Sequence, residues 1–100
     1  MEFSDVKITV LKKLRTDEVL REYGVKEVES ECPFIKLGHE YISKGMNIPE
    51  GFCSWAWADI QRDVVHLGMG GDFPWISRKG VMVSSCTDGL RPVVFKLERA

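Results

Sequence analysis

Hydrophobic and polar residues alternate along the first part of the chain, from residue 5 to residue 13. The apolar side of this segment is β-branched and consists of Val6, Ile8 and Val10. Alternation with a period of two is typical of a half-buried β-strand. A short helix is predicted next, over residues 16–23, because Thr16 is a suitable N-cap and Gly24 a suitable stop.

A longer helix is predicted over residues 54–67, after a short strand at residues 40–43, and Gly68 is placed to end it. Apolar residues recur at helical spacing on one side of this segment, at Trp57, Ile60, Val64 and Leu67. The other side carries Trp55, Asp59, Arg62, Asp63 and His66. Trp55 is unusual there, because it is a large aromatic residue on the charged face.

The last third of the chain predicts a β-hairpin. Residues 81–86 have the pattern of a strand, and Asp88-Gly89 is typical of a two-residue turn because both positions tolerate positive φ. The return strand places Val93, Phe95 and Leu97 on one face. The order strand, helix, strand, helix, hairpin indicates a single α+β domain over residues 1–100, with a small, mostly antiparallel sheet packed against two helices.

Length and charge limit the classes of function. A chain of 100 residues forms one domain, and so short a domain covers more of its surface by becoming a homo-oligomer. A net charge of −1, from 14 basic and 15 acidic residues, gives no indication of binding to nucleic acid or to an anionic membrane. No apolar run approaches the ~20 residues that span a bilayer, and the N-terminus lacks a signal-peptide pattern. We therefore expect a cytoplasmic protein with reduced thiols.

Three cysteines stand at turns or at the boundaries of predicted elements, namely Cys32, Cys53 and Cys86. If the fold brings them together they could bind zinc or iron, since thiolates suit soft and borderline metals. The close C-x-x-C pairs that are usual in such sites are absent. The alternative is that each cysteine is a small buried hydrophobic residue.

Cys53 differs from the other two because it immediately precedes the long predicted helix. Unpaired N–H groups and the helix dipole stabilise a thiolate at this position, so Cys53 could be a nucleophile, a redox thiol or a metal ligand. A structural role is the alternative.

Asp63 and His66 lie three residues apart on one helical face and could supply a proton-transferring imidazole. The alternative is that His66 is simply a solvent-exposed residue at the helix end.

The glycine-rich segment 68–75 is predicted to form a wall of a pocket. Ending a helix requires only Gly68, so the further glycines, with Asp72 and Trp75, exceed that need. The segment matches neither a phosphate-binding loop nor a dinucleotide fingerprint. Trp75, like Trp55, could contact a small molecule or a second subunit, since aromatic side chains anchor both kinds of interface.

The predicted hairpin loop, residues 86–92, contributes two further candidates for ligand binding, Asp88 and Arg91. Asp88 is explained by the turn alone, whereas the turn does not require Arg91. The forked donors of Arg91 could hold a carboxylate or a phosphate of a ligand, or they could pair with Asp88 or with an acid on a helix.

Four blocks of sequence resemble an uncharacterised family of small prokaryotic proteins. They are Cys32-Pro33, the stretch GFCSWAWADI at residues 51–60, GGDFPW at residues 70–75 and CTDGLRPV at residues 86–93. The resemblance covers nearly the whole chain. It implies no activity, cofactor or catalytic residue.

Three hypotheses follow from these observations. The first is a small-ligand-binding or metal-binding domain, with a site near Cys53 and the loops at residues 68–75 and 86–92. The second is a thiol-dependent enzyme that uses Cys53, with Asp63 and His66 or with Arg91. The third is a non-catalytic homo-oligomeric interaction module whose tryptophans form the interface.

Overall fold

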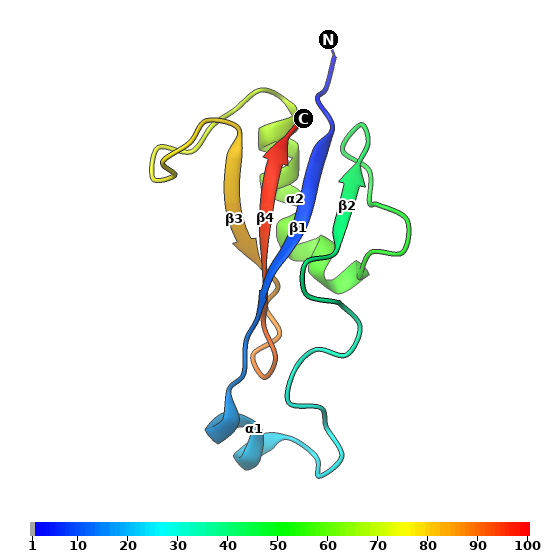
Figure 1. The fold of residues 1–100 in the computed structure, drawn as a ribbon, viewed down its shortest axis with the longest axis vertical. Helices are drawn as coiled ribbons and strands as arrows, with labels where there is room; N and C mark the ends of the chain where they lie inside the picture. The colour runs from blue at the N-terminus through cyan, green and yellow to red at the C-terminus, as the bar shows by residue number, and fades with distance from the viewer. Residues whose placement is uncertain (1) are drawn as a thin grey trace.

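The computed structural model describes residues 2–100 and arranges them as a four-stranded antiparallel sheet with one long helix across one face (Figure 1). The elements in chain order are β1 (Val6–Lys13), α1 (Asp17–Tyr23), β2 (Glu40–Ser43), α2 (Ser54–Gly68), β3 (Val81–Ser85) and β4 (Val93–Arg99). The strands lie in the order β2-β1-β4-β3, so the first and last strands pair at the centre of the sheet. This confirms the predicted single α+β domain.

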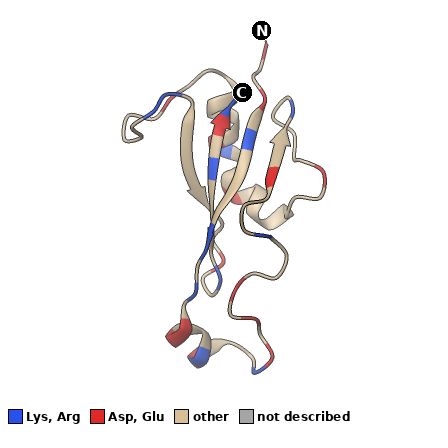
Figure 2. Cartoon of the chain, viewed as in Figure 1, with Lys and Arg blue, Asp and Glu red and all other residues tan. Residues whose placement is uncertain are grey.

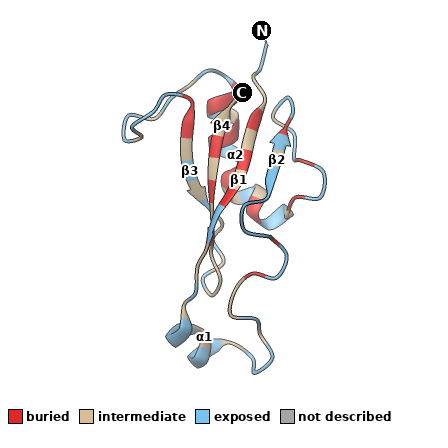
Figure 3. Cartoon of the chain, in the orientation of Figure 1, coloured by how far each residue is buried: buried red, intermediate tan, exposed pale blue. Residues whose placement is uncertain are grey.

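The core lies between α2 and the inner faces of the two central strands. Ile8 of β1 pairs with Leu97 of β4, and Val10 pairs with Phe95, so the apolar sides of both strands face the same way. The helix closes this layer with residues that are all buried, namely Ala56, Ile60, Val64 and Leu67. Figure 3 shows the buried positions alternating along β1 and β4 and gathering on α2. The alternation and the helical stripe seen in the sequence therefore identified the core.

A β-bulge interrupts the pairing of β1 with β4 near the end of β1. Val10 pairs with Phe95 but Lys12 already pairs with Val94, so Leu11 is the extra residue on β1. The two strands continue past the bulge beyond the layer covered by α2, and β1 leads there into α1 (Figure 1).

The short helix α1 departs from the expectation that both helices pack against the sheet. It has no buried residue, and it lies at one end of a molecule that measures 50 × 29 × 20 Å (Figure 3). Thr16 occupies the N-cap position but makes no capping bond, since its hydroxyl donates to the carbonyl oxygen of Leu90 at 2.6 Å. Acidic residues outnumber basic ones over residues 17–31, on α1 and the segment after it (Figure 2).

The predicted two-residue turn at Asp88-Gly89 is wrong. The last backbone bond of the hairpin runs from the amide of Cys86 to the carbonyl of Val93, so residues 87–92 form a longer loop. Asp88 shapes this loop with its side chain, because its Oδ1 accepts hydrogen bonds from the amides of Leu90 (2.9 Å) and Arg91 (3.2 Å). Aspartate side chains commonly replace backbone acceptors in this way.

No helix within residues 2–100 is long and apolar enough to cross a membrane.

Truncating the centre of the helical stripe tests this packing. Ile60 is fully buried, and Ile60→Ala removes methylene groups from a layer that cannot fully close around the gap. We expect the free energy of unfolding to fall by about 2–5 kcal/mol in urea denaturation. The neighbouring Gln61 is exposed, so Gln61→Ala is the matched control and should change it by less than about 0.5 kcal/mol. Equal effects of the two substitutions would contradict the assigned helix face.

Candidate functional site

A cavity of about 640 Å³ lies at the N-terminal end of α2. Its lining comes from three segments that are distant in sequence, within residues 32–35, 51–59 and 86–91. The first segment precedes β2, the second turns into α2, and the third is the loop between β3 and β4. Pockets for small molecules commonly have volumes of roughly 300–1,000 Å³, so this cavity has the size of a ligand site.

All three cysteines line this cavity, and all three are free thiols. Cys32 is buried, while Cys53 and Cys86 are partly exposed and pack against the core. The fold therefore brings together the residues that the sequence singled out for a possible zinc or iron site. Across the described part of the chain, no group of three or more His, Cys, Asp or Glu side chains is arranged to hold a metal ion.

Cys53 occupies the N-cap position of α2, as the sequence predicted. Its carbonyl accepts the first helical hydrogen bond, from the amide of Trp57 at 2.9 Å, but its side chain makes no capping bond. The amides of residues 54–56 therefore have no acceptor within the helix. The first turn of α2 also contains no acidic residue, so its positive end is not neutralised locally.

Tyr41 is a neighbour of Cys53 that the sequence analysis missed. Its ring stacks on that of His39, with centroids 4.3 Å apart, and meets the ring of Phe52 edge-on at 4.9 Å. The pKa of Tyr41 is raised, first by burial and then by the negative charge of a Cys53 thiolate. Tyr41 could have been found from the strand alternation, because it pairs with the buried Ile8 on the inner face of the sheet.

The loop after β3 is fixed to α2 by Asp59, a second residue whose role the sequence did not reveal. Its carboxylate accepts two hydrogen bonds from Thr87, one from the amide at 2.8 Å and one from the hydroxyl at 2.9 Å. The sulfur of Cys86 accepts a further bond from the amide of Val93 at 3.2 Å. These contacts set the wall of the cavity opposite the helix start. The sequence offered one indication of this role, because Asp59 lies one helical turn after Trp55 and therefore on the same face of the helix.

Arg91 lines the same cavity and has unused hydrogen-bond donors. Its Nε lies 3.4 Å from Oδ2 of Asp88, and its side chain is 20% exposed. That Nε is buried without a hydrogen-bond partner, and within residues 2–100 the guanidinium of Arg91 makes no hydrogen bond to another residue; only the backbone amide of Arg91 donates to Asp88. Of the two sequence-based interpretations of Arg91, pairing with Asp88 is therefore present, but it leaves the outer guanidinium nitrogens free for another acceptor.

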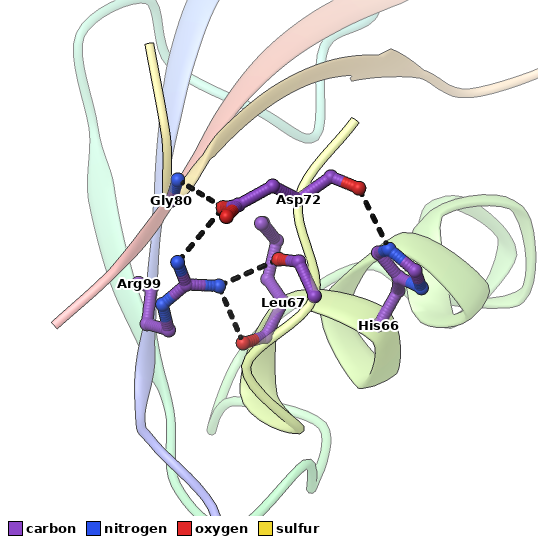
Figure 4. Close-up of polar contacts among 6 residues, drawn as sticks. His66, Leu67, Asp72, Gly80 and Arg99 are labelled. Atoms are coloured by element: carbon purple, nitrogen blue, oxygen red, sulfur yellow. Dashed lines mark hydrogen bonds and ion pairs between the residues drawn. The ribbon is translucent and has the colours of Figure 1, made fainter. Parts of the chain in front are cut away.

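The glycine-rich segment lies at the other end of α2 and does not line this cavity (Figure 4). Asp72 accepts hydrogen bonds from the amide of Gly80 at 2.6 Å and from Arg99 at 2.8 Å. The other terminal nitrogen of Arg99 donates to the carbonyls of Leu67 (3.1 Å) and Gly71 (2.6 Å). Asp72 therefore closes the loop that follows α2, and its role as a ligand-binding residue stays a prediction from the sequence.

The two tryptophans that could contact a ligand or subunit do not form one patch. Trp55 lines the cavity and is 80% exposed. Trp75 is 68% exposed and packs at a tilted angle on Phe73, which in turn packs on His66 near the end of α2. The two indoles therefore belong to opposite ends of the helix.

The proposed combination of Cys53 with Asp63 and His66 is not assembled. Cys53 and His66 are separated by most of α2, roughly 20 Å at 1.5 Å per residue. The imidazole of His66 instead lies 3.0 Å from the carbonyl oxygen of Asp72 (Figure 4). Asp63, expected on the charged face, is only 4% exposed, and its nearest charged group is Nε of Arg62 at 3.6 Å.

Comparison of this chain with known protein families, curated proteins and solved structures gives no match. The resemblance to a family of small prokaryotic proteins stays a prediction from the sequence.

The contact of Asp72 with Arg99 predicts an acid-dependent loss of stability. The hydrogen bond from Arg99, followed by that from Gly80, holds the pKa of Asp72 below its usual value. A lowered pKa in the folded state stabilises the protein above the pKa of the unfolded state, ~3.9, and that contribution disappears as pH falls through the folded pKa. Asp72→Asn should therefore be less stable than the unsubstituted protein at neutral pH.

The measurement is thermal unfolding between pH ~7 and pH ~2.5, and the difference between the two proteins should narrow below pH ~4. Glu22→Gln is the control, because Glu22 is an exposed carboxylate on α1. A difference that stays constant over this pH range would show that the Asp72 carboxylate does not contribute through its charge.

Proposed function

We propose that this protein is a small-ligand-binding domain whose site is the cavity at the N-terminal end of α2. The observation that supports this function is the convergence of Cys32, Cys53 and Cys86 with Trp55 and Arg91 on one cavity. Ligand sites are mostly apolar, with a few placed polar groups that orient the ligand. This cavity has that composition, because thiol, aromatic and aliphatic side chains line it together with a few polar residues, namely Ser54, Asp59, Asp88 and Arg91.

The lining favours a ligand with a flat apolar part. Trp55 and Phe34 are both strongly exposed and both line the cavity, so both leave aromatic surface in water next to it. Ile35 and Ala56 are buried and form part of the apolar wall. A planar group placed against Trp55 and Phe34 would bury aromatic surface that is otherwise in water, which stabilises the complex by the hydrophobic effect.

A neutral fluorescent probe tests whether this cavity binds apolar molecules. We expect N-phenylnaphthylamine to bind with one-to-one stoichiometry and to slow the alkylation of Cys53. Cys53→Phe fills the cavity and should weaken probe binding by about tenfold or more. Gln61→Phe adds the same ring to an exposed position of the same helix and should leave binding within about twofold.

Circular dichroism of both variants establishes that they fold, and Cys86→Phe provides a second cavity-filling substitution. If the probe binds both cavity-filled variants as tightly as the unsubstituted protein, the cavity is not the binding site and the proposed function is wrong.

A thiol-dependent enzyme is the second candidate, and the position of Cys53 favours it. Cys53 is the N-cap residue of α2, the amides of the next three residues have no acceptor within the helix, and the first turn contains no acidic residue. Arg91 lines the same cavity and could hold an anionic substrate near this thiol, whereas Asp63 and His66 lie elsewhere.

Alkylation rates separate this candidate from simple ligand binding. If Cys53 is an activated nucleophile, iodoacetamide at pH ~7 should modify it at least about tenfold faster than Cys86, which is also partly exposed. Peptide mass spectrometry after short exposures gives both rates in one sample. Equal alkylation rates for Cys53 and Cys86 would contradict the thiol-dependent enzyme and would leave ligand binding as the proposed function.

Zinc or iron binding by the same thiols, homo-oligomerisation and a cytoplasmic location stay predictions from the sequence.

A further inference from the structure

We infer that the ligand of this cavity carries an oxyanion, a carboxylate or a phosphate, and that Arg91 and the first amides of α2 hold it. This inference rests on the proposed function and specifies the class of ligand that the site accepts.

The first argument is the contrast between Arg99, the last residue of β4, and Arg91, two residues before β4 begins. Both terminal nitrogens of Arg99 donate to the protein, to Leu67, Gly71 and Asp72. The Arg91 side chain is equally shielded, with 20% of the side chain exposed in each case, but within residues 2–100 its one polar contact is the 3.4 Å ion pair to Asp88. A guanidinium has five N–H donors in a planar fork that matches carboxylate and phosphate oxygens. Arg91 lines the cavity, and within residues 2–100 none of its side-chain donors makes a hydrogen bond to the protein.

The second argument is that the two acids lining the cavity, Asp59 and Asp88, accept their hydrogen bonds from groups other than the Arg91 side chain. Both oxygens of Asp59 accept hydrogen bonds from Thr87. Oδ1 of Asp88 accepts two backbone amides of its own loop, while Oδ2 pairs with Arg91. Neither carboxylate accepts a hydrogen bond from the Arg91 side chain, whose Nε is buried without a hydrogen-bond partner within residues 2–100. A ligand or water would supply the acceptor that the guanidinium lacks there.

The third argument is the start of α2, which forms part of the same lining. Ser54, Trp55 and Ala56 all border the cavity, and their amides have no acceptor within the helix. With no acid in the first turn and no cap from Cys53, the partial positive charge of the helix end adds to that of Arg91. Amides at a helix start together with an arginine are a recurrent arrangement for binding oxyanions.

The two parts of the lining define the ligand as a whole. Its oxyanion would lie between Arg91 and the helix start, and its apolar part would lie against Trp55 and the thiols. A charged hydrogen bond that is shielded from water contributes more than a neutral one, so removal of the ligand charge should weaken binding strongly.

The test compares three probes that share a benzene ring, namely benzoate, phenyl phosphate and the neutral benzamide. Each is titrated into the reduced full-length protein, and binding is followed by amide NMR shifts at residues 53–56 and 86–91. We expect one or both oxyanions to bind about tenfold more tightly than benzamide. The ratio of benzoate to phenyl phosphate then shows whether the site prefers a carboxylate or a phosphate.

Arg91→Gln should remove this advantage, while Arg62→Gln should leave it within about twofold, because Arg62 is 88% exposed on α2. If Arg91→Gln does not give a folded spectrum, Arg91→Lys is compared with Arg62→Lys. Lysine keeps the charge but loses the fork, so only the substitution at position 91 should reduce the advantage.

The outcomes distinguish this inference from the function on which it rests. If benzamide shifts the cavity resonances and binds as tightly as the oxyanions, the cavity is a ligand site but the oxyanion inference is wrong. If the oxyanions bind but Arg91→Gln has no effect, the assignment of Arg91 is wrong. If no probe, charged or neutral, shifts these resonances, neither the inference nor the proposed function stands.

Discussion

The packing of α2 against the inner face of β1 and β4 is the contact on which both ends of the molecule depend. It fixes where the helix starts and where it stops, and each end is then joined to the sheet by a different set of bonds. At the start, Asp59 holds the β3–β4 loop through Thr87. At the end of the helix, Arg99 of β4 donates hydrogen bonds to the carbonyl oxygens of Leu67 and Gly71 (Figure 4). The C-terminal end of α2 is therefore bonded to the sheet through Arg99, whereas the first amides at its N-terminal end have no acceptor within the helix and border the cavity.

Most of the fold could be predicted from the sequence because its signals are local. Alternation at Val6, Ile8 and Val10 and helical spacing at Ile60, Val64 and Leu67 both reflect burial on one face, and all of these residues are buried. The prediction of a two-residue turn between β3 and β4 was wrong because the Asp88 side chain replaces the backbone hydrogen bonds of a tight turn. Residue preferences do not distinguish these two uses of an Asp-Gly pair, since both are favourable.

The candidate site was predictable only in part. The helix start at Cys53 follows from local pattern, and so does the position of Trp55 on the face away from the core. The meeting of Cys32 and Cys86 with Cys53 depends on strand order and loop paths, which no local pattern contains. The surroundings of Asp63 and Asp72 could not be predicted for a related reason. Their surroundings are set by α2 packing and by Arg99, a residue that lies 27 positions from Asp72 in the chain.

The assembly of the cavity wall from three distant segments has a consequence for folding. Residues 32–35, 51–59 and 86–91 meet only when the helix is docked and the hairpin is closed. A partly unfolded chain that releases any one segment therefore loses the whole site, and the unfolded chain has none. By linkage, an occupant at one hundred times its dissociation constant would stabilise the entire domain by about 2.7 kcal/mol. For a domain of this length that is a substantial share of a typical total of roughly 5–15 kcal/mol. The cellular lifetime of the protein would then follow the concentration of its ligand, so that abundance itself would report whether the cavity is filled.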